Sequence, residues 1–166
     1  FGKIIGGGMP VGAYGGRREV MELIAPSGPV YQAGTLSGNP VAMAAGLAGL
    51  RLLRDTPGFY EDLNQKADRF FEGMKDALAE AGKPWQLNHI GSLGCIFFTK
   101  GPVSNYAQAK TSDTKAFAEY FSFMLRQGIY LAPSQFEAMF LSAAMTDGEL
   151  EGVLESFKNY LKESQF

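Results

Sequence analysis

The sequence predicts an α/β fold in which a small, mainly antiparallel sheet is packed with helices. From residue 55 to the end, apolar residues recur at helical spacing in several stretches, and short alternating stretches between them indicate strands. The first 38 residues are instead rich in glycine and weakly periodic, so they cannot bury a core of their own. We therefore expect two parts, residues 1–54 and residues 55–166, of which the second is a compact domain.

The first part is expected to contain two short elements and one longer helix. Lys3 is followed by two β-branched residues, which predicts a short extended segment, and a short helix is expected at residues 17–23. Asn39 can cap a helix, and Pro40 suits the first helical position because its missing N–H is not needed there. This helix should continue to about Arg54.

The second part predicts helices and strands in turn. The expected elements are a helix from Thr56-Pro57 that ends at Gly82, strands at 86–90 and 94–99 joined by a Gly91-Ser92 turn, an exposed loop at 100–112, a helix from about Asp113 to Gln127, and strands at 129–131 and 138–142. Thr146 and Glu149 have the spacing of a capping box, which predicts a final helix. The aromatic stripes on these helices should form the core.

Composition and charge exclude several classes of protein. Apolar residues make up 46% and charged residues 19% of the chain, as in folded globular domains. A net charge of −2 provides no basic surface for nucleic acid. We expect no membrane span and no signal peptide, since no apolar run approaches the roughly 20 residues that cross a bilayer. Cys95 is the only cysteine, which suits a reducing cytoplasm, and we expect it to be buried and not catalytic.

One lysine lies in the glycine-rich stretch GKIIGGGMPVGAYGG at residues 2–16. Glycines 6–8 leave the backbone near Lys3 open to a ligand, and a primary amine beside such an opening suits Schiff-base chemistry with a flat carbonyl compound. A surface lysine before a glycine-rich turn is the alternative interpretation. A GxxxxGK[ST] phosphate loop is excluded, because this lysine precedes the glycines and no Ser or Thr follows it.

Two other polar residues occur among apolar neighbours. Glu137 lies in the run Phe136 to Phe140, where a carboxylate must be paired, hydrogen-bonded or functional. His89, the only histidine, falls in an expected strand. No Cys, Asp or Glu lies at ligand spacing from it, so we expect a structural histidine and no metal site.

Longer stretches resemble the pyridoxal-phosphate (PLP) enzymes of the class III aminotransferase group. GKIIGGGMPVGAYGGRREVM at 2–21 and GPVYQAGTLSGNP at 28–40 together resemble its glutamate-1-semialdehyde 2,1-aminomutase branch, which makes 5-aminolevulinate for tetrapyrroles. LAPSQFEAMF at 131–140 is similar to a C-terminal motif of that branch, except that Met139 replaces an expected glycine. Since the branch is far longer, the resemblance implies the C-terminal part of a fold type I enzyme. Residues 1–54 would be a remnant of its large cofactor domain, and the fragment is expected to be inactive alone.

The resemblance also implies roles for four residues. Lys3 would hold PLP covalently and then move protons as a general acid and base. Gly34 and Thr35 would bind the cofactor phosphate of the partner subunit in a homodimer. Glu137 would lie near the substrate, glutamate-1-semialdehyde, where many class III aminotransferases have an arginine for the α-carboxylate. The enzyme is expected in the cytoplasm, or in the plastid if it comes from a plant.

Two alternatives stay open at this point. The chain can belong to another class III aminotransferase, one that uses a separate amino donor. It can also be a stable folded domain without catalysis, which acts at most in dimerisation or folding.

Overall fold

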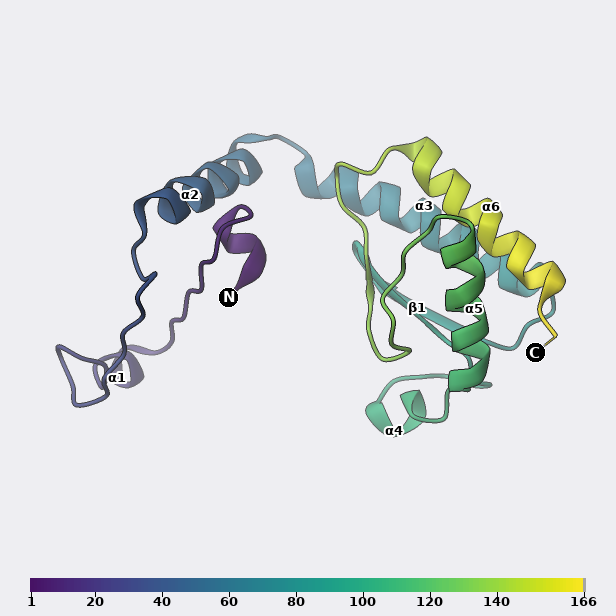
Figure 1. Ribbon diagram of the computed structural model, residues 1–166, viewed down its shortest axis with the longest axis horizontal. Coiled ribbons are helices and arrows are strands. Elements are labelled where there is room, and N and C mark those ends of the chain that lie inside the picture. Colours follow the sequence, from purple (N-terminus) through teal and green to yellow (C-terminus); the bar gives the residue numbers. More distant parts are fainter. Residues whose placement is uncertain (166) are drawn as a thin grey trace. The chain divides into compact units, whose positions relative to one another are not determined.

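The computed structural model describes residues 1–165, and the chain divides into two compact units, Phe1–Pro57 and Gly58–Phe166 (Figure 1). The first unit contains η1 (Lys3–Gly6), α1 (Arg18–Met21) and α2 (Pro40–Asp55). The second contains α3 (Phe59–Glu80), β1 (Gln86–Ile90), β2 (Leu93–Phe97), α4 (Tyr106–Ala109), α5 (Thr114–Arg126), β3 (Met139–Phe140) and α6 (Asp147–Glu163). None of the helices in residues 1–165 has the length and apolar character needed to cross a membrane.

The chain after Lys3 forms a 3-10 turn, so the predicted extended segment was wrong. The N–H of Gly7 donates to the oxygen of Ile4 at 3.0 Å, which closes the turn. A strand needs a neighbouring strand, and the described part of the first unit has only an isolated bridge between Ile24 and Val30. The propensity of two β-branched residues is therefore overridden by local hydrogen bonding.

Helix α2 begins as the sequence predicts. The side-chain oxygen of Asn39 accepts hydrogen bonds from the N–H groups of Val41 and Ala42, each at 3.1 Å, and Pro40 occupies the first helical position. The cap satisfies N–H groups that have no partner inside the helix. Helix α3 begins at Phe59 instead of Thr56-Pro57, because Thr56 ends α2 and Gly58 turns the chain with a φ of 73°.

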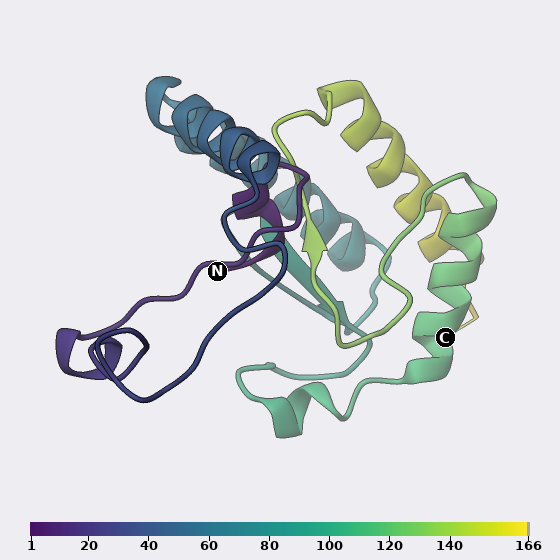
Figure 2. The ribbon, with the colours of Figure 1, turned by 60° about the vertical axis from the view of Figure 1, so that its left-hand side comes forward.

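The sheet has the order β1-β2-β3 and both pairs are antiparallel, which confirms the expected small antiparallel sheet (Figure 2). Gly91, with a φ of 50°, forms the turn between β1 and β2. Leu87 pairs with Ile96, and both lie on the face that meets the helices. On the same face, a methyl group on Gly94 would collide with the ring of Phe71, so only glycine lets α3 approach this closely.

The core of the second unit consists of the predicted helix faces. Its largest fully buried side chains are Phe71, Met74, Tyr120, Met124, Phe157 and Tyr160. Tyr160 donates a hydrogen bond to the oxygen of Ala116 at 3.3 Å, which ties α6 to α5. The aromatic stripes are therefore packing surfaces, as expected.

Two predictions for the second unit were wrong. Residues 129–131 form no strand, because α5 ends in a Schellman motif. The N–H groups of Gly128 and Ile129 donate to the oxygens of Leu125 and Met124, so the chain turns back onto the helix. The expected loop at residues 100–112 contains α4, and its Val103 is buried.

Candidate functional site

Lys3 opens the 3-10 turn with its side chain exposed to solvent. Its φ is 52°, and it is the one non-glycine residue within positions 1–165 that has a positive φ. The left-handed region costs an L-residue on the order of 1 kcal/mol, and such strain concentrates at functional sites. In the described chain the Lys3 amine has no hydrogen-bond or ion-pair partner, so it is available to a ligand.

The backbone on either side of this turn is open. A methyl group added to Gly2 or to Gly8 would meet nothing within 4 Å. A flat molecule can therefore approach the backbone at these two positions, one and five residues from Lys3, without meeting side chains. This is the arrangement that Schiff-base chemistry needs.

The opposite side of the turn is fixed on α2. A methyl group on Gly46 would lie 2.6 Å from the oxygen of Ile5, and one on Gly7 would lie 2.5 Å from the oxygen of Ala45. Gly7 also has a φ of 57°, which favours glycine. The two backbones therefore touch directly, and this contact determines where Lys3 is held.

Gly34 and Thr35 lie in the turn just before α2. The N–H of Ser37 donates to the oxygen of Gly34 at 2.9 Å, and the N–H of Asn39 donates to that of Leu36 at 3.1 Å. Thr35 is exposed, and within residues 1–165 its hydroxyl makes no hydrogen bond. A free hydroxyl on an exposed turn can donate a hydrogen bond to a phosphate oxygen. No polar bond joins Thr35 to Lys3 in this part of the chain.

Glu137 belongs to the second unit and ends a turn in which its N–H donates to the oxygen of Ser134 at 3.1 Å. It is exposed, and its carboxylate has no polar partner among the residues that the structure describes. It borders an open cavity of about 380 Å³. The walls are mostly apolar: they include Phe70, Ile129, Leu131, Met139, Leu141 and Met145. These walls agree with the apolar neighbours of Glu137 in the sequence, and within residues 1–165 its carboxylate is neither paired nor hydrogen-bonded, the first two of the three possibilities named above.

His89 and Cys95 have structural surroundings. The Nε2 of His89 lies 3.1 Å from the Oδ1 of Asp68, and its ring stacks on Phe71 at 5.0 Å between centroids. Cys95 is half-buried, and burial raises the pKa of its thiol to about 11, so little thiolate exists at neutral pH. Within residues 1–165, no three His, Cys, Asp or Glu side chains come together as a metal site.

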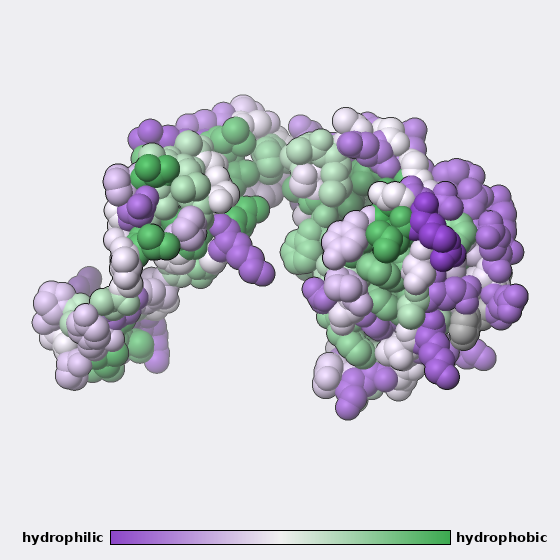
Figure 3. Space-filling view, viewed as in Figure 1, coloured by the Kyte–Doolittle hydropathy of each residue, from purple (hydrophilic) through white to green (hydrophobic). Residues whose placement is uncertain are grey.

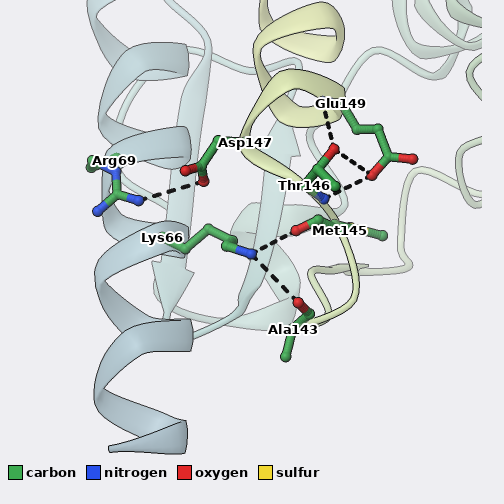
Figure 4. Close-up of polar contacts among 7 residues, drawn as sticks. All are labelled: Lys66, Arg69, Ala143, Met145, Thr146, Asp147 and Glu149. Atoms are coloured by element: carbon green, nitrogen blue, oxygen red, sulfur yellow. Dashed lines mark hydrogen bonds and ion pairs between the residues drawn. The ribbon is translucent and has the colours of Figure 1, made fainter.

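Lys66 on α3 holds the segment that leads from β3 to α6 (Figure 4). Its amine donates to the oxygens of Met145 at 2.6 Å and Ala143 at 3.5 Å.

Next to the Lys66 contacts, Thr146 and Glu149 form the predicted capping box. Hydrogen bonds from Thr146 keep the pKa of Glu149 below its ordinary value, so the cap contributes at neutral pH and is lost as the pH falls through that lowered pKa. Met145 lines the Glu137 cavity, so the hydrogen bond from Lys66 to the Met145 oxygen also fixes one wall of that cavity.

Replacing Lys66 by methionine is expected to lower the free energy of unfolding by about 1 kcal/mol, because two carbonyls lose a charged donor. Chemical denaturation measures this. Lys75 is the matched control, since its one polar contact within residues 1–165 is a surface ion pair with Glu72 at 2.8 Å, and Lys75→Met should change little. Equal effects of the two substitutions would contradict the anchor.

A comparison with protein families decides where this chain belongs. The family model described as aminotransferase class-III matches residues 1–161. The chain belongs to the class-III aminotransferase family. The prediction of an α/β fold with a small antiparallel sheet agrees with the solved structures of transaminases that it matches.

The curated relatives that resemble this class-III chain are longer than it is. The glutamate-1-semialdehyde 2,1-aminomutase of Ruminiclostridium cellulolyticum is 56% identical over 164 residues, which are 99% of this chain and 38% of the relative. The enzyme of that name from Thermus thermophilus is 53% identical over 156 residues, 94% of this chain and 36% of the relative. The chain thus spans little more than a third of the length of these relatives.

Solved structures of class-III-like enzymes share the fold. The β-phenylalanine aminotransferase of Variovorax paradoxus matches with a TM-score of 0.84 and 32% identity, over 98% of this chain and 37% of that one. An omega-transaminase from Sphaerobacter thermophilus matches with a TM-score of 0.80 and 34% identity, over 97% of this chain and 37% of that one. A glutamate-1-semialdehyde aminomutase from Pseudomonas aeruginosa in complex with PMP matches with a TM-score of 0.67 and 23% identity, over 79% of this chain and 29% of that one.

Reasoning from the sequence missed two residues of this class-III chain, one in each unit, that hold candidate site residues in place. Gly46 holds the Lys3 turn, and its partner Ile5 is distant in sequence. Gln135 is buried beneath the turn that carries Glu137. Only the second had a local signal, namely an amide within the apolar run that follows Pro133.

Proposed function

We propose that a protein as long as these relatives and containing this chain (below, the full-length protein) converts glutamate-1-semialdehyde to 5-aminolevulinate with PLP as cofactor. The observation that carries the proposal is Lys3: an unpartnered primary amine, in a left-handed backbone conformation, beside open glycine backbone. The sequence around it is 53–56% identical to curated proteins of that name over nearly the whole chain.

The residues present fit PLP. The Lys3 amine can condense with the cofactor aldehyde, and the Thr35 hydroxyl with the N–H groups of its turn can bind a phosphate. When bound, PLP supplies an electron sink for the carbon next to the reacting amine. Lys3 would act as the general base that removes a proton from a carbon next to the reacting nitrogen and as the general acid that returns one.

Glu137 would bind the amino group of the substrate. A carboxylate can bind an ammonium group through a charge-assisted hydrogen bond, and a substrate seated in the apolar cavity would remove water from around that bond. An arginine at this place would instead favour a carboxylate. The reaction moves nitrogen from C2 to C1 within one molecule, so a group that retains the amino side of the substrate suits it.

We also propose a cytoplasmic homodimer in which Gly34 and Thr35 bind the phosphate held by the partner subunit. Apolar side chains on the surface of the first unit support an assembly (Figure 3). Val41, Leu47, Leu50 and Leu52 of α2 are between 48% and 61% exposed. Light scattering of the full-length protein tests the dimer, and a monomer at micromolar concentration would contradict it.

A class-III aminotransferase with a separate amino donor is the second candidate. It is favoured by the two solved structures at 32–34% identity, which are an omega-transaminase and a β-phenylalanine aminotransferase. The full-length protein with glutamate-1-semialdehyde and no added amino acid decides between them. We expect 5-aminolevulinate to form under these conditions. A strict need for a second amino compound would favour the aminotransferase.

Glu137→Gln is expected to lower kcat/KM for glutamate-1-semialdehyde roughly 10- to 100-fold, the cost of a lost bond to a charged group. Steady-state kinetics of the full-length protein measure this. Glu155→Gln is the control, because Glu155 is an exposed glutamate on α6 outside the cavity. An unchanged kcat/KM in Glu137→Gln would remove Glu137 from the site.

A further inference from the structure

A buried amide lies beneath the turn that carries Glu137. Gln135 is only 3% exposed, and its Nε2 donates to the oxygen of Ile96 at 2.7 Å. The bond joins residues 39 apart in sequence and connects the turn to β2. The backbone N–H groups of Phe136 and Glu137 donate to Ser134 within the turn, so the only other polar contacts from the described residues of β2 to the turn are the weak ones of the Cys95 thiol.

Gln135 occupies the edge of β2 where the sheet pairing ends. Strand β3 pairs with β2 only at Leu93 and Gly94, so the edge beyond them has no strand partner in the described chain. There the Gln135 amide donates a hydrogen bond to the carbonyl oxygen of Ile96, in the place of a strand partner. The Sγ of Cys95 lies 3.8 Å from the oxygen of Gln135 and 3.7 Å from that of Glu137, so the turn rests against the strand.

Burying the Gln135 amide costs free energy that burying an apolar side chain would not. Its Oε1 is buried and has no hydrogen-bond partner among residues 1–165. An unsatisfied buried oxygen destabilises a fold, and an apolar side chain of similar length would avoid that penalty. A directional bond placed here at such a cost specifies the position of the turn.

We propose that Gln135 is a positioning residue, which places the Glu137 carboxylate at the edge of its cavity by tying the turn to β2. The proposal rests on the role given to Glu137 under the proposed function. Gln135 itself touches no reacting group. Its effect on the reaction passes through Glu137, and its effect on the turn is independent of any activity.

The single thiol of this chain reports on the turn directly. In Gln135→Met the turn loses its side-chain hydrogen bond to β2 and keeps only the weak contacts with the Cys95 thiol. Labelling of Cys95 by an aromatic disulfide reagent should therefore accelerate roughly tenfold, which corresponds to the free energy of one buried hydrogen bond. Gln86→Met is the matched control, because the Gln86 amide donates to the nearby oxygen of Pro84 at 3.1 Å and to no other residue that the structure describes. An unchanged labelling rate in a folded Gln135→Met chain would overturn the proposal. If methionine prevents folding, Gln135→Asn keeps the amide but cannot reach Ile96, and the same acceleration is expected.

A double-mutant cycle in the full-length protein tests the link to Glu137. Gln135→Met should lower kcat/KM about tenfold in the wild-type background and leave it unchanged when Glu137 is already glutamine. Equal losses in both backgrounds would indicate a structural role and overturn the proposal. The proposed function fails separately, if Glu137→Gln alone leaves kcat/KM unchanged.

Discussion

Lys3→Ala in the full-length protein is expected to lower kcat by at least about 10³-fold while the fold and assembly persist. The amine carries both the bond to the cofactor and the proton transfer, and acid–base catalysis alone contributes 10²- to 10⁴-fold. The side chain is exposed, so its loss removes little packing. Lys3→Arg should fail equally, since a guanidinium stays protonated and does not condense with an aldehyde.

Lys100→Ala is the control for this substitution, because Lys100 is exposed and lies in the loop before α4, in the other unit. Initial rates with glutamate-1-semialdehyde measure kcat, and circular dichroism checks the fold. Near-normal turnover of Lys3→Ala would exclude the assigned role.

Gly46→Ala is expected to lower kcat roughly 100-fold and to reduce stability by about 1–3 kcal/mol. The added methyl would lie 2.6 Å from the oxygen of Ile5, so the 3-10 turn must move away from α2 and take Lys3 with it. A displacement of 1 Å at a reacting group can cost about 10²-fold in rate. Thermal unfolding and initial rates of the full-length protein measure the two effects.

Gly49→Ala is the matched control on the same helix. A methyl group there would lie 3.8 Å from the Cα of Gly7, which is an ordinary contact, and alanine favours a helix over glycine by about 1 kcal/mol. We therefore expect Gly49→Ala to be as active as the original and slightly more stable. If both alanine variants behave alike, the contact between η1 and α2 does not hold Lys3.

The sequence predicted the features that depend on local chemistry. The Asn39 cap and the capping box of Thr146 and Glu149 follow from side-chain oxygens placed next to N–H groups of the same helix. The antiparallel pairing of β1 with β2 follows from a short turn at Gly91. Each prediction needed only residues within a few positions of one another.

The features that the sequence did not predict depend on distant partners. The left-handed Lys3 lies on a turn that is fixed where Gly46 lets two backbones touch. The Gln135 amide has a buried partner because Ile96, 39 residues away, offers its carbonyl oxygen at a strand edge. Propensity and periodicity contain no information about such pairs, so Lys3 and Glu137 could be named while the contacts that position them could not.

The most direct test of the account asks which lysine holds the cofactor. The full-length protein is saturated with PLP and reduced with borohydride, which fixes the bond between the cofactor and an amine, and its peptides are mapped by mass spectrometry. The account predicts one modified residue, Lys3. Modification of another lysine, or labelling spread over many lysines with none dominant, would contradict it.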